Sequence, residues 1–239
     1  MGSVLLRAAC TNSFEIPIET PIRPKLDVAA FQRVLVAGFI AGGTEDVDGN
    51  LETTRLLRSQ LRTKSQLRVI DSDVLPLVDV ASEGRDSGGA TTTPVAIKEE
   101  KDLEAYEHVF ANVEYWKKIG EEYQQPLIVT GTVMFTPLQR NSIVQREQEV
   151  YDSFGRRRVV PVRTYMERKG FSLDGRFIFI DGRSGATLHS ESFGEQILYN
   201  ANQTTPALSS YFELMDRLIP TFLSTLSSQK IKGTRILLQ

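Results

Sequence analysis

Residues 177–193 read FIFIDGRSGATLHSESF, and this stretch decides the fold. An apolar run ends at Asp181-Gly182, a short polar segment closes with Ser184-Gly185, and a half-polar run follows. Asp, Ser and Gly are residues of tight turns, so the pattern predicts two antiparallel strands, residues 170–180 and 186–199, joined at this tip. The pattern alone leaves open whether the tip is a chemical site or only a turn.

The composition limits the classes of partner. The chain has 239 residues, 41% hydrophobic and 24% charged, which is ordinary for a soluble globular protein. A formal charge of −2 gives no reason to expect nucleic acid or an anionic membrane as partner. The charge is uneven, because residues 140–170 hold eight basic and four acidic residues and the remainder carries −6. No run of about 18 apolar residues occurs, so no membrane-spanning helix is predicted.

One cysteine, Cys10, and two histidines, His108 and His189, limit the chemistry further. A single cysteine excludes an internal disulfide, and three such residues without familiar spacing do not favour a zinc site. No nucleophile elbow and no metalloprotease motif is present. No metal, no cofactor and no small-molecule substrate is expected, and nucleophilic catalysis is disfavoured. Catalysis by paired carboxylates stays open, because the 30 acidic residues offer many pairs.

The first half of the chain predicts a βαβ unit. Residues 31–40 have a continuous apolar middle, which is typical of a strand buried on both faces. Residues 51–64 place leucines at helical spacing after Asn50, the expected helix cap. Residues 67–71, LRVID, form a second short strand, although the sequence does not prove that the two strands are parallel.

The second half predicts a helix, a strand, two hairpins, another helix and a final strand. In order, these elements cover residues 103–123, 127–135, 142–152 with 158–167, 170–180 with 186–199, 205–228 and 231–238. Residues 72–102 lose the periodicity and contain SEGRDSGGATTT, so a mobile loop is expected there.

These elements predict the fold class α/β. We expect a single domain over residues 31–239, whose mixed β-sheet is opened by the βαβ unit and extended by antiparallel hairpins. The long hairpin covers residues 140–170, and about three helices cover the sheet.

The first ten residues, MGSVLLRAAC, are similar to the end of a bacterial lipoprotein signal peptide. In such a peptide the cysteine that follows the cleavage site carries the lipid, which makes Cys10 the expected lipid attachment site. Arg7 and the short apolar stretch depart from that pattern, so a frayed N-terminus with an incidental thiol stays open as the alternative. Residues 11–30 contain three prolines within 17–24 and are expected to be an extended tether, or an arm that lies against the domain.

Two loops are candidates for binding. The loop from Gly42 to Asn50 has glycines between a strand and a helix, as phosphate sites do, but it lacks a P-loop motif and carries several acidic residues. A capped helix start is the favoured interpretation, and a soluble nucleotide- or metal-binding enzyme that uses this loop is the alternative. Arg156, Arg157 and Arg158 lie at the tip of the long hairpin and are the candidate partner-binding residues. A solvated tip or a docking point for an acidic protein surface is favoured there over binding of nucleic acid or lipid phosphates.

An ordered set of motifs resembles a family of bacterial envelope proteins. The hairpin Asp181-x-x-Ser184-Gly185-x-x-Leu188 resembles a hairpin of CsgG-like periplasmic domains, the curli-secretion lipoprotein type. Amino-terminal domains of Tol-type translocation proteins and lipoprotein activators of cell-wall synthases share it. Residues 34–39, 51–71 and 128–133 resemble the first strand, the following helix–strand unit and the Thr-Gly-Thr strand of these domains. The order holds from residue 31 to about residue 226.

This resemblance implies that the tip is a turn without a catalytic role. It implies a non-enzymatic accessory protein of the bacterial envelope, located in the periplasm and tethered to the outer membrane through a lipid. Such a protein binds other envelope proteins or self-associates in envelope assembly or secretion. A pore-forming secretion subunit is a third hypothesis, but charged residues alternate along both faces of the long hairpin, and each costs about 2–4 kcal/mol at mid-bilayer.

Overall fold

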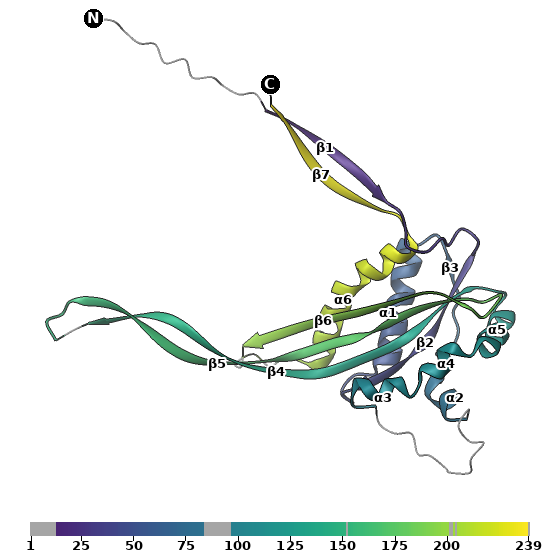
Figure 1. The fold of residues 1–239 in the computed structure, drawn as a ribbon, viewed down its shortest axis with the longest axis horizontal. Helices are drawn as coiled ribbons and strands as arrows, with labels where there is room; N and C mark the ends of the chain where they lie inside the picture. Colours follow the sequence, from purple (N-terminus) through teal and green to yellow (C-terminus); the bar gives the residue numbers. More distant parts are fainter. Residues whose placement is uncertain (1–12, 84–96, 152, 201–202, 204, 239) are drawn as a thin grey trace, which may run out of the picture.

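The computed structural model describes residues 13–83, 97–151, 153–200, 203 and 205–238. Its centre is a five-stranded sheet in the order β3-β2-β4-β5-β6 (Figure 1). The strands are β2 (Arg33–Gly43), β3 (Arg68–Val69), β4 (Leu127–Tyr151), β5 (Arg157–Asp181) and β6 (Thr187–Asn200). β2 runs parallel to β3 and β4, whereas β4–β5 and β5–β6 are antiparallel. The predicted mixed sheet, opened by a βαβ unit and extended by hairpins, is confirmed.

Helices cover both faces of this sheet. α1 (Gly49–Lys64) and α6 (Ala207–Leu226) pack on one face, and the other face carries α2 (Leu77–Glu83), α3 (Glu100–Glu104), α4 (Glu107–Ala111) and α5 (Val113–Glu122). β2 lies between the two layers, so its side chains are buried on both faces. Val34 and Val36 face α1 and α6, whereas Leu35 faces the other layer. In the described part of the chain, no helix combines the length and apolarity that crossing a membrane requires.

The layer of short helices differs from the expected single helix over residues 103–123. The chain breaks at Asn112, whose side chain accepts a hydrogen bond from the backbone N–H of Tyr115 at 3.1 Å and caps α5. The predicted apolar stripe is still core, because five of its members are buried: Tyr106, Val109, Phe110, Trp116 and Ile119. Among the described residues, three longer helices, α1, α5 and α6, and three short ones therefore cover the sheet.

The expected mobile loop over residues 72–102 includes helical structure. α2 and the first residues of α3 lie in this range, and the expectation is wrong there because Leu77 and Ala81, one helical turn apart, pack into the core. A helix of two turns is too short to stand out as a period in the sequence. Most of the Gly/Ser/Thr-rich stretch falls on residues 84–96, outside the described residues.

The start of α1 also differs from the expectation. Asp48, not Asn50, is the helix cap, and its carboxylate accepts from the backbone N–H of Leu51 at 2.9 Å. The Asn50 side chain accepts from the backbone N–H of Phe39 at 2.7 Å, beside the irregular pairing of β2 and β4 at residues 36–38. Asn50 thus ties the helix to the strand before it.

The two ends of the described chain form a second, two-stranded sheet. β1 (Ser13–Ile22) pairs antiparallel with β7 (Gln229–Leu238) over its whole length. Figure 1 shows this ribbon leaving the body of the protein in a direction different from that of the long hairpin. β1 starts at the ribbon's far end, so the ribbon separates Ser13 from the five-stranded sheet by about 33 Å.

Glu191 on β6 holds the base of this ribbon against the body. Its carboxylate accepts hydrogen bonds from the Lys25 ammonium and from the Thr225 hydroxyl, and the Leu26 N–H donates to the Thr225 carbonyl. Burial raises the pKa of Glu191, but the bonds from Lys25 and Thr225 outweigh burial, so its pKa is lowered overall.

A lowered carboxyl pKa means stability that is present at neutral pH and lost in acid. We expect Glu191→Gln to reduce the free energy of unfolding by about 1 kcal/mol at pH 7. The difference from the parent should vanish as the pH falls through the pKa of the folded state, below the unfolded value of about 4.3. Urea unfolding at a series of pH values measures it. Glu195→Gln on the same strand is the control. If the free energy of unfolding of both variants depended on acidic pH in the same way, the role of Glu191 would be contradicted.

Candidate interaction surface

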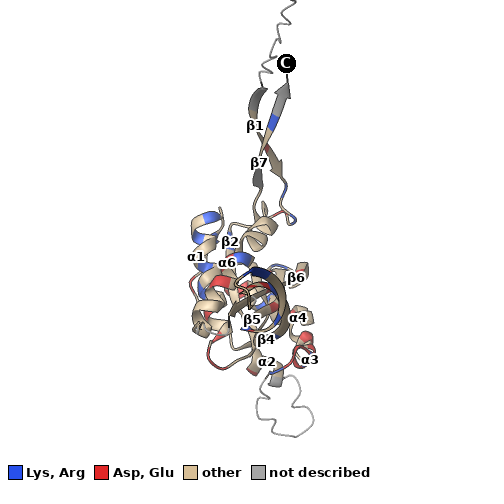
Figure 2. Cartoon of the chain, turned by 90° about the vertical axis from the view of Figure 1, so that its left-hand side faces the viewer, with Lys and Arg blue, Asp and Glu red and all other residues tan. Residues whose placement is uncertain are grey.

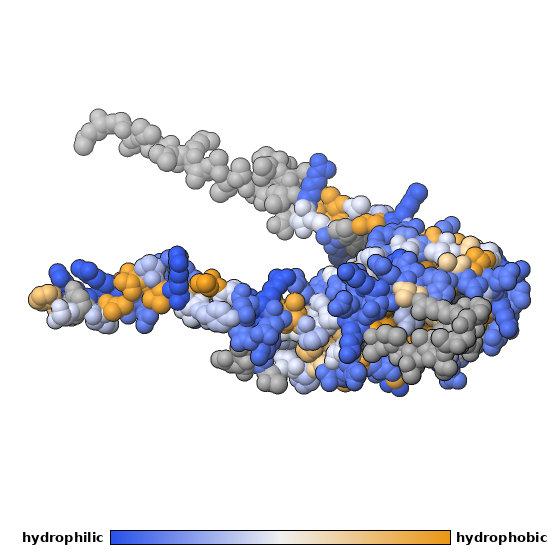
Figure 3. Space-filling model, turned by 60° about the horizontal axis from the view of Figure 1, so that its bottom comes forward, coloured by the Kyte–Doolittle hydropathy of each residue, from blue (hydrophilic) through white to orange (hydrophobic). Residues whose placement is uncertain are grey.

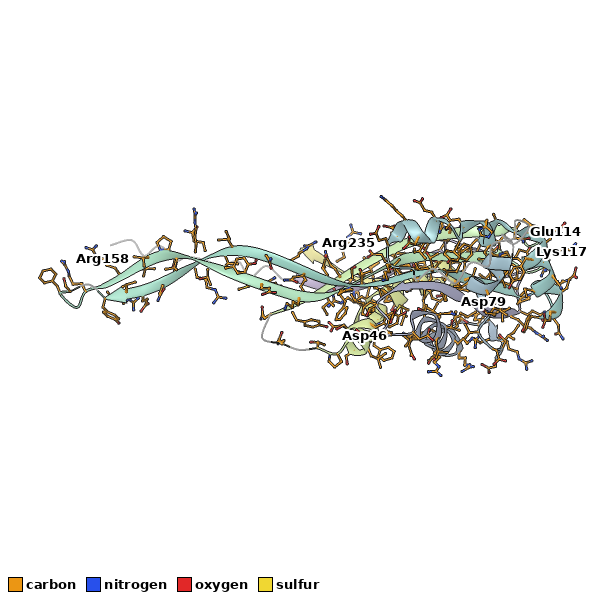
Figure 4. The ribbon with its side chains drawn as sticks, turned by 90° about the horizontal axis from the view of Figure 1, so that it is seen from below. Asp46, Asp79, Glu114, Lys117, Arg158 and Arg235 are labelled. Atoms are coloured by element: carbon orange, nitrogen blue, oxygen red, sulfur yellow. The ribbon has the colours of Figure 1, made fainter. Side chains whose placement is uncertain are left out.

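The β4–β5 hairpin extends well beyond the sheet that anchors it. β2 pairs with β4 only as far as Phe135, and β6 pairs with β5 only as far as Arg168. Residues 141–151 and 157–167 therefore pair only with each other, and we call them the distal hairpin (Figures 1 and 4). Isolated two-stranded hairpins are marginally stable in water, and their outer edges carry unpaired backbone groups that favour contact with another chain.

The register of β4 and β5 assigns every side chain of the hairpin to one of two faces. Because successive strand residues point to opposite sides, the even-numbered residues of both strands share one face. Over the paired residues 140–151 and 157–168, which the structure describes, this face carries four arginines, five apolar side chains and no carboxylate. We call it the arginine face: Arg140, Arg146, Arg158 and Arg168, with Val144, Val150, Val160, Val162 and Met166 between them.

The opposite face, which we call the mixed face, balances its charges internally. Arg157 pairs with Glu149 at 3.1 Å, and Glu167 pairs with Lys169 at 3.3 Å. Exposed apolar groups lie there as well, since Ile143 is 71% exposed and its register partner Tyr165 is 64% exposed. On the side of the hairpin that Figure 3 shows, apolar and polar groups are interleaved along its length.

Three of the four arginines of the arginine face lack such compensation among the described residues. Arg140 and Arg168 are direct register partners, and like charges placed opposite each other destabilise a strand pair. Arg140, Arg146 and Arg168 make no ion pair with any part of the chain that the structure describes. A surface with unbalanced positive charge and interleaved valines is complementary to an acidic surface with apolar side chains.

The three arginines predicted at the tip do not act as one cluster. Arg156 lies in the turn with its guanidinium 5.4 Å from the ring centre of Phe154, which is 81% exposed. Arg157 belongs to the mixed face, and Arg158, close to the tip in Figure 4, belongs to the arginine face. The predicted lipid attachment site, Cys10, lies outside the described residues.

Sequence reasoning missed Arg140, Arg146 and Arg168 as members of one surface. The alternating direction of side chains along a strand could be inferred from the sequence, and it assigned residues 143–151 to two faces. What brings residue 140 opposite residue 168 is the cross-strand register, and the buried proximal half of the β4–β5 pairing fixes that register.

The loop from Gly42 to Asn50 uses its polar groups in local structure. The Thr44 hydroxyl donates to Asp46 at 3.0 Å, and Asp48 and Asn50 are occupied by backbone N–H groups. Within the described ranges, no group of three or more His, Cys, Asp and Glu side chains is placed to hold a metal. His189 Nε2 lies 3.7 Å from Glu191, and His108 Nδ1 lies 2.9 Å from the Ala105 carbonyl.

A cavity of about 530 Å³ lies between α3, α4 and the sheet. Acidic residues gather on α3 (Figure 2), and Glu100, Glu104 and Glu107 line the cavity together with Asp174. Arg176 crosses to Glu107 at 2.7 Å, so part of this charge is neutralised within the chain.

The comparisons with known proteins give similar structures but no family. No protein-family model matches the chain, and no curated protein sequence matches it significantly. Three similar solved structures are lipoprotein GNA1162 of Neisseria meningitidis, the PelC dodecamer of Paraburkholderia phytofirmans and a neuraminyllactose-binding hemagglutinin homolog of Helicobacter pylori.

Their identities to this chain are 13%, 14% and 12%, with TM-scores of 0.36, 0.38 and 0.36, in that order. The matches cover 80%, 90% and 84% of this chain and 97%, 100% and 84% of the respective structures.

Reversing one charge of the facing arginine pair tests the arginine face. We expect Arg168→Glu to raise the free energy of unfolding by about 0.2–1 kcal/mol at low salt, because a cross-strand repulsion becomes an attraction. The gain should shrink in 1 M salt, where the Debye length is about 3 Å. Urea unfolding at two salt concentrations measures it. Lys169→Glu, which breaks an ion pair on the mixed face, should bring no gain, and a gain of equal size there would contradict the assignment of faces.

Proposed function

We propose that this chain is a non-enzymatic accessory protein of the bacterial envelope that binds protein partners through the arginine face of its distal hairpin. One observation carries the proposal: a hairpin that projects from a well-packed core presents a face with only positive charge between exposed and half-buried apolar side chains. Such a face stays soluble by itself and gains stability when an acidic surface covers it.

The cellular setting rests on the sequence resemblance. The ordered motifs of the CsgG-like domains support a place in the periplasm and a role in envelope assembly or secretion. The similarity of MGSVLLRAAC to a lipoprotein cleavage site supports a lipid on Cys10. With that lipid, the β1–β7 ribbon would hold the sheet away from the membrane surface, which leaves the distal hairpin free to reach other envelope proteins or a second copy.

The hairpin gives less support to a pore-forming role. A strand hairpin that crosses a bilayer needs one face of apolar residues over about 9–11 positions per strand. On the arginine face, Arg146 lies between Val144 and Val150 in the distal part of β4. On the mixed face, Glu147 and Arg163 place charges among the apolar side chains. We expect this hairpin to lie in water or against protein.

Site-specific photocrosslinking in the cells that make this protein tests the proposal. A photoreactive side chain at Gln148 lies on the arginine face, and the same group at Gln145 lies on the mixed face of the same strand. We expect Gln148 to give a discrete adduct with an envelope protein or with a second copy, and Gln145 to give little of it.

Charge reversal then identifies the interaction. Arg146→Glu should remove most of the adduct, whereas Arg163→Glu, an equally exposed change on the mixed face, should leave it. Equal adducts from both positions, or an adduct that survives Arg146→Glu, would contradict the proposal.

A further inference from the structure

The turn at Asp181–Ala186, between β5 and β6, is held rigidly against α5. The Asp181 carboxylate accepts from the Arg183 N–H at 2.9 Å and from the Ser184 hydroxyl at 3.2 Å. The turn backbone lies so close to α5 that a Cβ on Gly120 would collide with the Gly182 carbonyl, and one on Gly185 with the carbonyl of Val113. The backbone of Arg183 is therefore held in a fixed position.

A polar cavity of about 230 Å³ lies beside this turn. Its lining comes from three separate segments that meet at the end of the sheet: the chain entering β2, the loop after α5, and the turn itself. Besides Ala30, the lining consists of two guanidinium groups and three side-chain amides, with no carboxylate: Gln32, Arg33, Gln124, Gln125 and Arg183.

Among the described residues, only neutral groups bind the two guanidinium groups. Arg33 donates to the side-chain oxygen of Gln124, and Arg183 donates to the Ala30 carbonyl at 2.5 Å while lying over the ring of Phe31. Neither arginine has an ion pair among the described residues. Each guanidinium carries five N–H donors, so most of them remain available to a ligand.

A third positive charge lies next to this pair. Arg68 is the register partner of Arg33 across β2 and β3, and the described residues offer it no ion pair either. Asp71, the carboxylate on the neighbouring surface that Arg33 and Arg68 line, pairs with Arg62. Three guanidinium groups thus lie at this end of the sheet, and none of them has an ion pair among the described residues.

The backbone of the lining is also unusual. Gln124 and Gln125 have φ values of 64° and 55°, in the left-handed region that costs non-glycine residues of order 1 kcal/mol each. The bond from the Gln125 N–H to the Gly120 carbonyl at 2.6 Å holds this conformation, directly before Pro126. Glycine would relieve the strain, but it would remove the two amide side chains from the lining.

We propose that this cavity binds an oxyanion, a carboxylate or a phosphoryl group, between the guanidinium groups of Arg33 and Arg183. A guanidinium binds two oxygens of one anion through parallel N–H groups, and two of them approaching from different segments clamp it. The amide groups of Gln32 and Gln125 supply further neutral donors. The anion would also link the segment before β2 to the β5–β6 turn. This site lies apart from the distal hairpin and does not depend on the proposed function.

Thermal unfolding with inorganic phosphate and with acetate, each against sodium chloride at equal ionic strength, tests the cavity on the full chain. We expect a saturable rise in Tm for at least one oxyanion, about 3–6 °C at ten times its Kd. A rise with phosphate alone identifies a phosphoryl site, and a rise with acetate alone identifies a carboxylate site such as the end of a polypeptide.

Arginine variants locate the binding. Arg33→Gln and Arg183→Gln should each weaken the oxyanion effect, and the double variant should abolish it, whereas Arg217→Gln on α6 should leave it unchanged. Near-ultraviolet circular dichroism first selects the variants that fold like the parent. Phosphate binding to these variants is then measured from the phosphorus NMR line width during a titration, which separates lost binding from lost folding. The proposal is overturned if neither oxyanion acts beyond chloride, or if the double variant responds like the parent.

Discussion

The pairing of β4 with β5 is the constraint on which the rest of the structure depends. It runs without a break in register from Leu127 opposite Asp181 to Tyr151 opposite Arg157. In its proximal half, the pairing directs Val129 and Phe179 to the α1–α6 layer and Ile128 and Ile180 to the α2–α5 layer. A slip of one residue on either strand would turn its apolar side chains to the wrong layer, so the core fixes the register.

The same register governs the distal half, where no core remains. There it sorts the described side chains by charge, with carboxylates and basic groups together on the mixed face and arginines without carboxylates on the other. Packing energy in the body thus determines which arginines share a surface far from it. The distal hairpin needs no core of its own to hold this pattern, because its strands continue from the sheet.

Local signals in the sequence predicted much of this fold. The turn residues between Asp181 and Gly185 located the β5–β6 hairpin, and the continuous apolar run at residues 34–37 identified a strand buried on both faces. The break at Asn112 was missed because the apolar stripe of residues 106–119 keeps its spacing across it. The pairing of β1 with β7 joins segments more than 200 residues apart, and no local sequence pattern predicts such a contact.

For the two candidate sites as well, the sequence showed local runs of residues but not the contacts between distant segments. Arg156, Arg157 and Arg158 were visible as a run, but strand alternation divides them, and the members of the arginine face are separated by up to 28 residues. The polar cavity at Arg33 and Arg183 joins three segments, so only the fold could assemble it. The turn that first appeared to be a simple chain reversal also fixes Arg183 at that cavity.

Cross-strand disulfide trapping measures the register of the distal hairpin most directly. In a Cys10→Ser background, the pair Ile143→Cys with Tyr165→Cys occupies register partners on one face, whereas Ile143→Cys with Thr164→Cys joins positions on opposite faces. Disulfides need Cα atoms about 4.4–6.8 Å apart and Cβ atoms that face each other. The account predicts rapid closure of the first pair under mild oxidation and little closure of the second. Preferential closure of the second pair would place the arginines on different faces and contradict the account.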